Sequence, residues 1–223
     1  MILCIDQGLT DEEVALIVTQ LEQAEFVDGK LTAGWHAKQV KHNTQLKNDA
    51  KPLQELQAIV TTALKRNRLF QTAVRPKTIR PCLFSRYEVG MYYGDHVDNA
   101  LMGDGALMRS DVSVTVFLSD PTTYEGGELV IDTATGEQSF KLAAGDIVAY
   151  PSTTLHRVEP ISAGERYAAV TWVQSLIRNV DEREILFELD TARQVLFEKH
   201  GKTPEFDLIC KSYANLLRKW VEL

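Results

Sequence analysis

Hydrophobic positions near the N-terminus repeat at helical spacing. The segment "LTDEEVALIVTQLEQAEF" begins with Thr10 as a helix N-cap and Glu13 at the third helical position, the two partners of a capping box. Leu9 and Val14 are spaced as a hydrophobic staple. A second set of apolar residues at helical spacing spans about 51–66, and "DGKLTAG" between the two reads as a turn. The first third of the chain therefore predicts two helices.

From about residue 79 to 175 the hydrophobic pattern changes to short alternating runs. In "DVSVTVFLSD" the apolar residues Val112, Val114, Val116 and Leu118 alternate, and "GGELVID", "GDIVAYP" and "RYAAVTWV" follow at short intervals. Gly126 and Gly127 suit a tight turn or a bulge, because glycine readily takes a positive φ. Many short strands without helices between them predict a β-sandwich or a jelly-roll barrel whose mouth holds a ligand.

Helical spacing returns after residue 178. The two predicted helices break at "HGKTPE", where Gly201 suits a C-cap and Pro204 suits the first turn of the next helix. We therefore predict one domain over 1–178, with its strands at about 79–178, and a helical region over 179–223. The apolar residues of these helices either pack on the barrel or form a homo-oligomer interface.

Composition narrows the class of protein. With 223 residues, 44% hydrophobic and 25% charged, the chain is typical of a globular protein. Its net charge of -7 disfavours a nucleic-acid partner, and the basic stretch 68–80 is expected to be a solvated face. Three scattered cysteines indicate neither disulfides nor a cysteine zinc site. No run reaches the roughly 20 apolar residues of a membrane helix, so we expect a cytoplasmic protein without a membrane partner.

The segment "MYYGDHVDNA", residues 91–100, carries the first candidate chemistry. In an extended strand His96 and Asp98 project from one face, while Asp95 and Val97 project from the other. His156 is the most plausible third ligand, since the other histidines precede the β region or end a predicted helix. Two histidines and one carboxylate suit the Fe(II) triad of non-haem oxygenases or a zinc site.

Arg166 favours the oxygenase interpretation. It lies ten residues after His156, on the strand that returns towards the same cavity. A guanidinium there could capture a carboxylate in a bidentate manner, which a zinc-dependent hydrolase would not require. Such a hydrolase also lacks an obvious glutamate as general base, but it stays an alternative, together with a non-catalytic jelly-roll binding module.

Three longer segments carry a resemblance to a known family. They are "RYEVGMYYGDHVDNALM", "RSDVSVTVFLSDPTTYEGGELVI" and "GDIVAYPSTTLHRVEPISAGERYAAVTWVQS". The chain resembles the Fe(II)- and 2-oxoglutarate-dependent dioxygenases, within them the prolyl 4-hydroxylase-like, bacterial PKHD-type hydroxylases. The resemblance is tight over about 79–178. It implies a mainly β fold with a double-stranded β-helix (jelly-roll) core, N-terminal helices packed on it and a C-terminal helical appendage.

The resemblance also implies roles for individual residues. His96, Asp98 and His156 would bind Fe(II), Arg166 would bind the distal carboxylate of 2-oxoglutarate, and Tyr87 would hydrogen-bond that cosubstrate. Related prolyl 4-hydroxylases often have lysine where this chain has arginine, which supports the bacterial branch. O2 would be the second cosubstrate and L-ascorbate a cofactor. The implied reaction hydroxylates a substrate C–H bond and releases succinate and CO2.

The substrate is open at this point. The family implies a peptide or a small molecule, and the association of this bacterial branch with iron uptake adds siderophore-related compounds. The segment "NALMGDGALMRSD" leaves the candidate metal site, and Gly103 and Gly105 suit a hinge. We predict that this segment is a substrate-binding loop or a lid.

Overall fold

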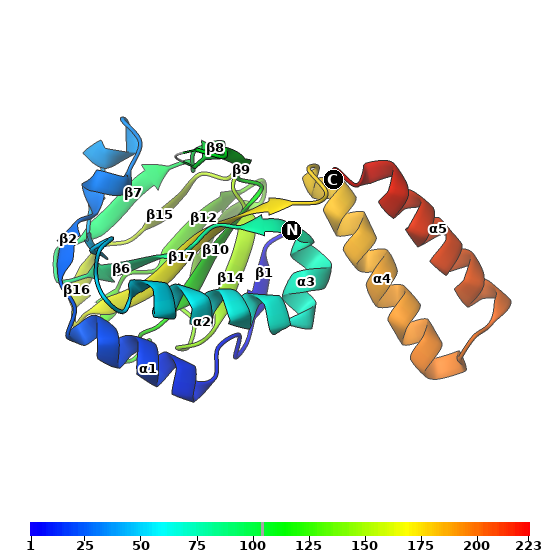
Figure 1. Ribbon diagram of the computed structural model, residues 1–223, viewed down its shortest axis with the longest axis horizontal. Helices are drawn as coiled ribbons and strands as arrows, with labels where there is room; N and C mark the ends of the chain where they lie inside the picture. The colour runs from blue at the N-terminus through cyan, green and yellow to red at the C-terminus, as the bar shows by residue number, and fades with distance from the viewer. Residues whose placement is uncertain (104) are drawn as a thin grey trace.

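Two antiparallel sheets packed face to face form the body of the protein (Figure 1). The computed structural model describes residues 1–103 and 105–223. Within that part the larger sheet has the order β1 (Leu3–Ile5), β14 (Ile147–Pro151), β10 (Val112–Phe117), β17 (Arg166–Ser175), β6 (Leu83–Tyr87), β4 (Thr44–Leu46) and β2 (Phe26–Asp28), with β5 (Pro76–Ile79) paired to β17. The smaller sheet has the order β13 (Gly136–Phe140), β12 (Leu129–Thr133), β15 (His156–Val158), β7 (Tyr92–His96) and β3 (Lys41–His42). This architecture confirms the predicted jelly-roll core.

Two further two-stranded pairings complete the strands. β11 (Glu125–Gly126) pairs with β16 (Ile161–Ala163), and β8 (Leu101–Met102) pairs with β9 (Met108–Arg109). The register shifts between Glu125 and Gly126, and both Gly126 and Gly127 have a positive φ. The bulge predicted for the two glycines is therefore confirmed.

In strand β10 the alternating sequence puts apolar and polar side chains on opposite faces. Val112, Val114 and Val116 belong to the apolar cluster that joins the larger sheet to the N-terminal helices. Ser113 and Thr115, on the opposite face of the strand, line the chamber between the two sheets. The valines of β10 thus face the helices, and its polar residues face the chamber between the two sheets.

Three helices cover the outer face of the larger sheet (Figure 1). They are α1 (Asp11–Glu22), α2 (Leu53–Arg66) and α3 (Arg68–Val74). The capping box of α1 is present, since Thr10 Oγ1 accepts from Glu13 N at 3.3 Å and Glu13 Oε2 accepts from Thr10 N at 3.0 Å. The two predicted helices are confirmed, and two 3-10 turns, η1 (Gly29–Thr32) and η2 (Ala37–Gln39), follow β2.

Two predictions about the first 80 residues were wrong. The stretch 68–80 is not merely a solvated face, because it forms α3 and β5 and buries Phe70 completely. The sheets also begin well before residue 79, with β1 to β5. These strands have only two to four residues, too few for a period-2 pattern to be visible in the sequence.

A helical hairpin, α4 (Val180–His200) and α5 (Pro204–Trp220), projects from one side of the jelly roll (Figure 1). Gly201 caps α4 with a φ of 68°, and Pro204 occupies the first turn of α5, as predicted. The hairpin packs against the body chiefly through α3 and α4. Among the helices of the described residues, none has the length and hydropathy to cross a membrane.

Candidate active site

The pairing of β7 with β15 brings the two candidate histidines together. His96 and His156 are direct cross-strand partners, and Asp98 follows two residues beyond the end of β7. One ligand atom from each of the three side chains lies within 4.8 Å of the others. Asp95 instead points outwards, with its carboxylate 3.6 Å from Arg157. The sheet register therefore produces the clustering that the sequence spacing predicted.

Backbone carbonyls orient both imidazole rings. His96 Nδ1 lies 2.8 Å from Gly94 O, and His156 Nδ1 lies 3.1 Å from Thr154 O. Because a carbonyl oxygen can only accept, each Nδ1 carries the proton and donates, which leaves the Nε2 lone pair for a metal. Burial, and then the neighbouring His156, lower the pKa of His96 to about 4. His96 is thus a neutral ligand at neutral pH.

Two serines that the sequence analysis did not single out hold Asp98. Ser113 Oγ lies 2.5 Å from Asp98 Oδ2, to which it donates, and 2.8 Å from Ser152 Oγ. The signal was present in the sequence, since Ser113 interrupts the run of valines in β10 on the face that points inwards. The pair fixes the orientation of the carboxylate towards the histidines.

Aromatic rings enclose the two histidines. Tyr93 stacks on His96 with ring centroids 3.6 Å apart, and Tyr150 lies edge-on to His156 at 5.1 Å. Behind Tyr93 the ammonium of Lys41 lies 5.0 Å from its ring centroid, and burial lowers the pKa of Lys41 to about 8. The two tyrosine rings pack against the two imidazoles, and the sequence analysis assigned none of these three residues to the site.

Arg166 lies at the start of β17, directly opposite Tyr87 on β6. It is 1% exposed, and its guanidinium carbon is 5.2 Å from the ring centroid of Tyr87 and 5.4 Å from that of Phe117. Its Nε has no hydrogen-bond partner in the described part of the chain. A buried cation with an unused donor is costly unless a ligand completes it, so this site suits an anionic ligand.

Two buried tyrosines that line the chamber, Tyr87 and Tyr150, lie near Arg166. Burial raises the pKa of Tyr87, with the charge of Arg166 opposing the shift, and burial raises the pKa of Tyr150 well above its ordinary value. Both phenols therefore keep their protons and can donate to a carboxylate or an oxo group. Tyr87 and Arg166, the two residues predicted to bind the cosubstrate, are cross-strand partners in the register of β6 and β17.

Gly127 makes room for the Arg166 side chain. A Cβ at this glycine would lie 3.0 Å from Arg166 Cδ and would collide with Ile161 Cδ1. Its φ of 70° also belongs to the left-handed region that favours glycine. The glycine therefore serves a packing role beside the buried cation, beyond the turn predicted for it.

The triad lies where an inner chamber meets an outer cleft. The chamber, of about 70 Å³, is lined by Tyr87, His96, Asp98, Ser113, Thr115, Tyr150, His156 and Trp172 among others. The cleft, of about 790 Å³, shares Tyr93, His96, Asp98 and Trp172 with it and extends to the β8–β9 hairpin. The chamber can hold a small cosubstrate between the triad and Tyr87, the cross-strand partner of Arg166, while the cleft can admit a larger molecule. The prediction that residues 99–110 form a substrate loop or lid falls partly on residue 104, which lies outside the described residues.

Comparison with known proteins identifies the class. A model of the 2OG-Fe(II) oxygenase superfamily matches residues 82–174, and one of the PKHD-type hydroxylase C-terminal domain matches residues 181–222. The chain is 60% identical to a PKHD-type hydroxylase of Thermosynechococcus vestitus, with 100% of both chains covered. It therefore belongs to the PKHD-type hydroxylases, a family of Fe(II)- and 2-oxoglutarate-dependent dioxygenases.

Solved structures confirm the fold. A prolyl-4-hydroxylase of Pseudomonas putida superposes with a TM-score of 0.57 at 19% identity, over 78% of this chain and 92% of that one. HygX from Streptomyces hygroscopicus, with nickel, 2-oxoglutarate and hygromycin B bound, gives a TM-score of 0.55 at 14% identity, over 78% and 82% of the two chains. The enzyme accordingly uses Fe(II), 2-oxoglutarate and O2, and the oxygenase prediction holds over the hydrolase and the binding module.

Proposed function

We propose that His96, Asp98 and His156 bind the Fe(II) of this dioxygenase, and that Arg166 and Tyr87 bind 2-oxoglutarate. One observation supports this most strongly: a buried guanidinium with an unused Nε donor lies in the same core as a His-Asp-His cluster. Two imidazoles and a carboxylate on one face suit Fe(II) and leave coordination positions open. When bound, Fe(II) and 2-oxoglutarate supply the O2 activation that hydroxylates a C–H bond, with release of succinate and CO2.

The residues of the chain then have separate tasks. Ser113 holds the Asp98 carboxylate, and the carbonyls of Gly94 and Thr154 hold the two imidazoles. Arg166 neutralises and orients the far carboxylate of 2-oxoglutarate, because a guanidinium binds that group through two parallel hydrogen bonds. A substrate enters from the outer cleft and presents its C–H bond to the triad.

Anaerobic reconstitution tests this assignment. Fe(II) and 2-oxoglutarate added to the wild type should give a metal-to-ligand charge-transfer band, and O2 should then yield succinate even without substrate. Arg166→Gln should retain Fe(II) but bind 2-oxoglutarate at least about tenfold more weakly, since charged hydrogen bonds are lost. Arg157→Gln is the matched control, because Arg157 follows His156 but pairs with Glu137 and Glu159 on the surface. Equal 2-oxoglutarate affinity in both variants would contradict the role of Arg166.

The proposal also covers the substrate class, the cellular location and the oligomeric state. We propose a peptide or small molecule, with peptidyl proline and siderophore-related compounds in iron uptake as the classes to assay first. We also propose a cytoplasmic location and L-ascorbate as a cofactor. The same proposal includes a domain boundary near residue 178 and self-association through α4 and α5. Three free cysteines and a net charge of -7 support the cytoplasmic location and argue against a nucleic-acid substrate.

A further inference from the structure

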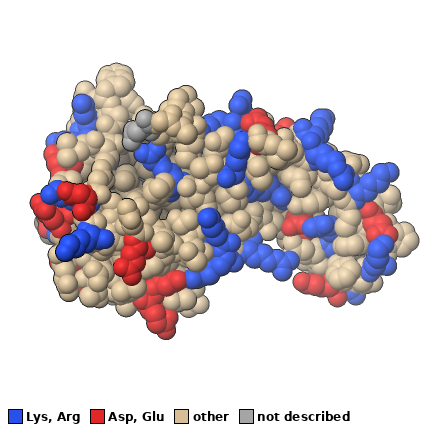
Figure 2. Space-filling model, viewed as in Figure 1, with Lys and Arg blue, Asp and Glu red and all other residues tan. Residues whose placement is uncertain are grey.

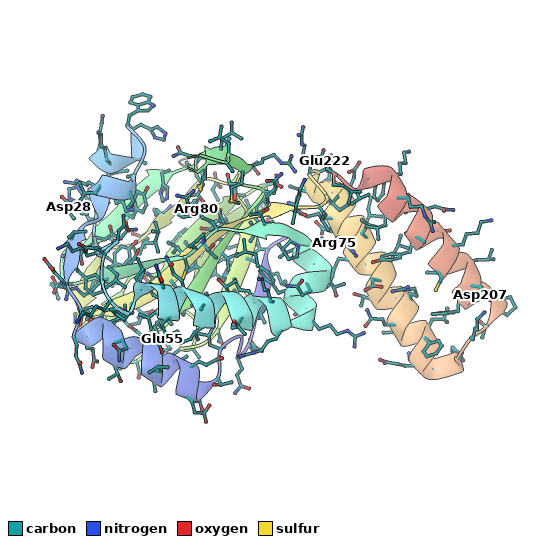
Figure 3. All side chains as sticks on the ribbon, viewed as in Figure 1. Asp28, Glu55, Arg75, Arg80, Asp207 and Glu222 are labelled. Carbon is teal, nitrogen blue, oxygen red and sulfur yellow. The ribbon has the colours of Figure 1, made fainter. Side chains whose placement is uncertain are left out.

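Arg80 occupies a fixed position in the wall of the outer cleft. It follows β5, where its backbone N donates to Trp172 O at 3.0 Å and its carbonyl accepts from Thr171 Oγ1 at 2.5 Å. Both partners belong to β17, the strand that also carries Arg166. Figure 3 shows Arg80 within the jelly-roll part of the molecule, well away from the α4–α5 hairpin. The side chain therefore extends from a backbone that the core holds rigidly.

The guanidinium of Arg80 differs from those of its neighbours. It is half-buried, and over residues 1–103 and 105–223 it has no hydrogen bond or ion pair. Four other arginines of the jelly-roll part are bonded to carboxylates, namely Arg66, Arg86, Arg109 and Arg157. A surface arginine without a partner is ordinary, but one in the wall of a substrate cleft is placed to bind a ligand.

Charge in the cleft is confined to two described side chains. Asp98 is committed to the triad, and Arg80 is the other; the remaining described lining residues are neutral polar or apolar, apart from the ligand His96. Once a metal neutralises Asp98, Arg80 is the one fixed cation among the described lining residues, and it attracts an anion and repels a cation. The cleft therefore favours anionic ligands, because a metal bound to the Asp98 carboxylate neutralises its charge.

The rim of the cleft is apolar. Leu31 is 76% exposed and Leu101 59% exposed, and both line the cleft together with Val97. Figure 2 shows the upper part of the jelly roll, around this opening, with few charged atoms. Exposed apolar side chains grouped at a binding site mark contact with an apolar ligand surface. The cleft therefore combines one anion-binding group with an apolar border.

We propose that the cleft of this hydroxylase selects substrates that carry a carboxylate on an apolar body, and that Arg80 binds that carboxylate. This inference rests on the function proposed above, because it takes the triad as the place of reaction. Arg80 is then a specificity-determining residue, separate from Arg166, which serves the cosubstrate in the inner chamber. Removing one charged hydrogen-bond donor from such a pair weakens binding by roughly tenfold to a hundredfold.

Matched acid and amide probes test this assignment. The anaerobic enzyme with Fe(II) and saturating 2-oxoglutarate is titrated with N-acetyl-L-leucine, N-acetyl-L-phenylalanine and N-acetyl-L-proline, and with the amide of each. Binding is followed by the shift of the charge-transfer band. In the wild type at least one acid should bind about tenfold or more tightly than its amide, and Arg80→Met should bind the two equally. Lys77→Met is the control, because it removes an exposed cation of β5, the strand that precedes Arg80, and should keep the preference.

The outcomes separate this inference from the proposed function. Equal binding of acid and amide by the wild type, no binding of any acid, or an acid preference that survives in Arg80→Met would each overturn the role of Arg80. If the wild type forms no charge-transfer band with Fe(II) and 2-oxoglutarate, the proposed function itself fails. Arg80→Met should retain the circular dichroism spectrum and the 2-oxoglutarate affinity of the wild type, which shows that it folds.

Discussion

The jelly-roll core and the C-terminal hairpin are built in opposite ways. All six residues of β10 are buried, whereas none of the residues of α5 is. In α4 the buried residues are Arg183, Leu186 and Asp190, so two of the three are charged. The core is thus held by apolar packing and the hairpin largely by polar contacts. We infer that strand register in the core sets the geometry of the site. A substitution in the hairpin should therefore leave the triad in place.

Several polar contacts attach the hairpin to the body. Arg183 Nη1 donates to Ile177 O at 2.8 Å, and Arg75 Nη2 lies 2.8 Å from the hydroxyl of Tyr213. Arg109 and Glu222 form another, at 2.9 Å between Nη1 and Oε2. Arg109 belongs to β9, beside the outer cleft, and Glu222 follows the end of α5; Figure 3 labels both Arg75 and Glu222 where the hairpin meets the body.

Truncating a leucine in each region gives the largest expected contrast. Leu56 on α2 is 0% exposed, so Leu56→Ala should lower the free energy of unfolding by about 2–5 kcal/mol through lost burial and a cavity. Leu208 on α5 is 63% exposed, and Leu208→Ala should change it by less than about 0.5 kcal/mol. Urea denaturation followed by circular dichroism measures both. Similar losses would mean that the exposed face of α5 is covered, for example in an oligomer.

Two glycines test whether the core positions Arg166. Gly127 and Gly136 both have a positive φ, but a Cβ would be crowded only at Gly127. Gly136→Ala should carry only the backbone strain, about 1 kcal/mol. Gly127→Ala should cost about 1–3 kcal/mol and also weaken 2-oxoglutarate binding, because it displaces the Arg166 side chain. Calorimetric titration and urea denaturation separate the two effects; equal 2-oxoglutarate affinity in both variants would contradict the packing role.

The sequence predicted the parts of the molecule whose pattern is local. The capping box at Thr10, the hairpin break at Gly201 and the same-face pair His96 and Asp98 each depend on residues within a few positions. The short strands before residue 79 were not predicted, since their pairing is decided by distant strands. Ser152 and Lys41 were missed for the same reason, because only the folded sheets bring them towards Asp98 and Tyr93.

Ser113, which holds Asp98, should contribute more to Fe(II) affinity than to the free energy of unfolding. Ser113→Ala removes a hydrogen bond to the carboxylate and should weaken Fe(II) binding by about 10–100-fold, as outer-shell substitutions do. Ser139→Ala, on the exposed strand β13, is the control and should leave Fe(II) affinity unchanged. Anaerobic titration with Fe(II) measures both constants. An unchanged affinity in Ser113→Ala would show that the backbone alone orients Asp98.

The smallest effect is expected where the two regions meet. Glu222→Gln keeps the size of the side chain but removes its charge from Arg109, and the Glu222 side chain is 43% exposed. Such a surface pair contributes about 0.2–1 kcal/mol, so the thermal midpoint should fall slightly, and less so at high salt. Arg109 keeps its two bonds to Asp111, at 2.6 and 3.0 Å, which hold β9 in place. Fe(II) affinity should therefore stay within about twofold of the wild type. A larger loss of affinity in the same Fe(II) titration would show that a change in the hairpin alters the triad. The two regions would then not be independent.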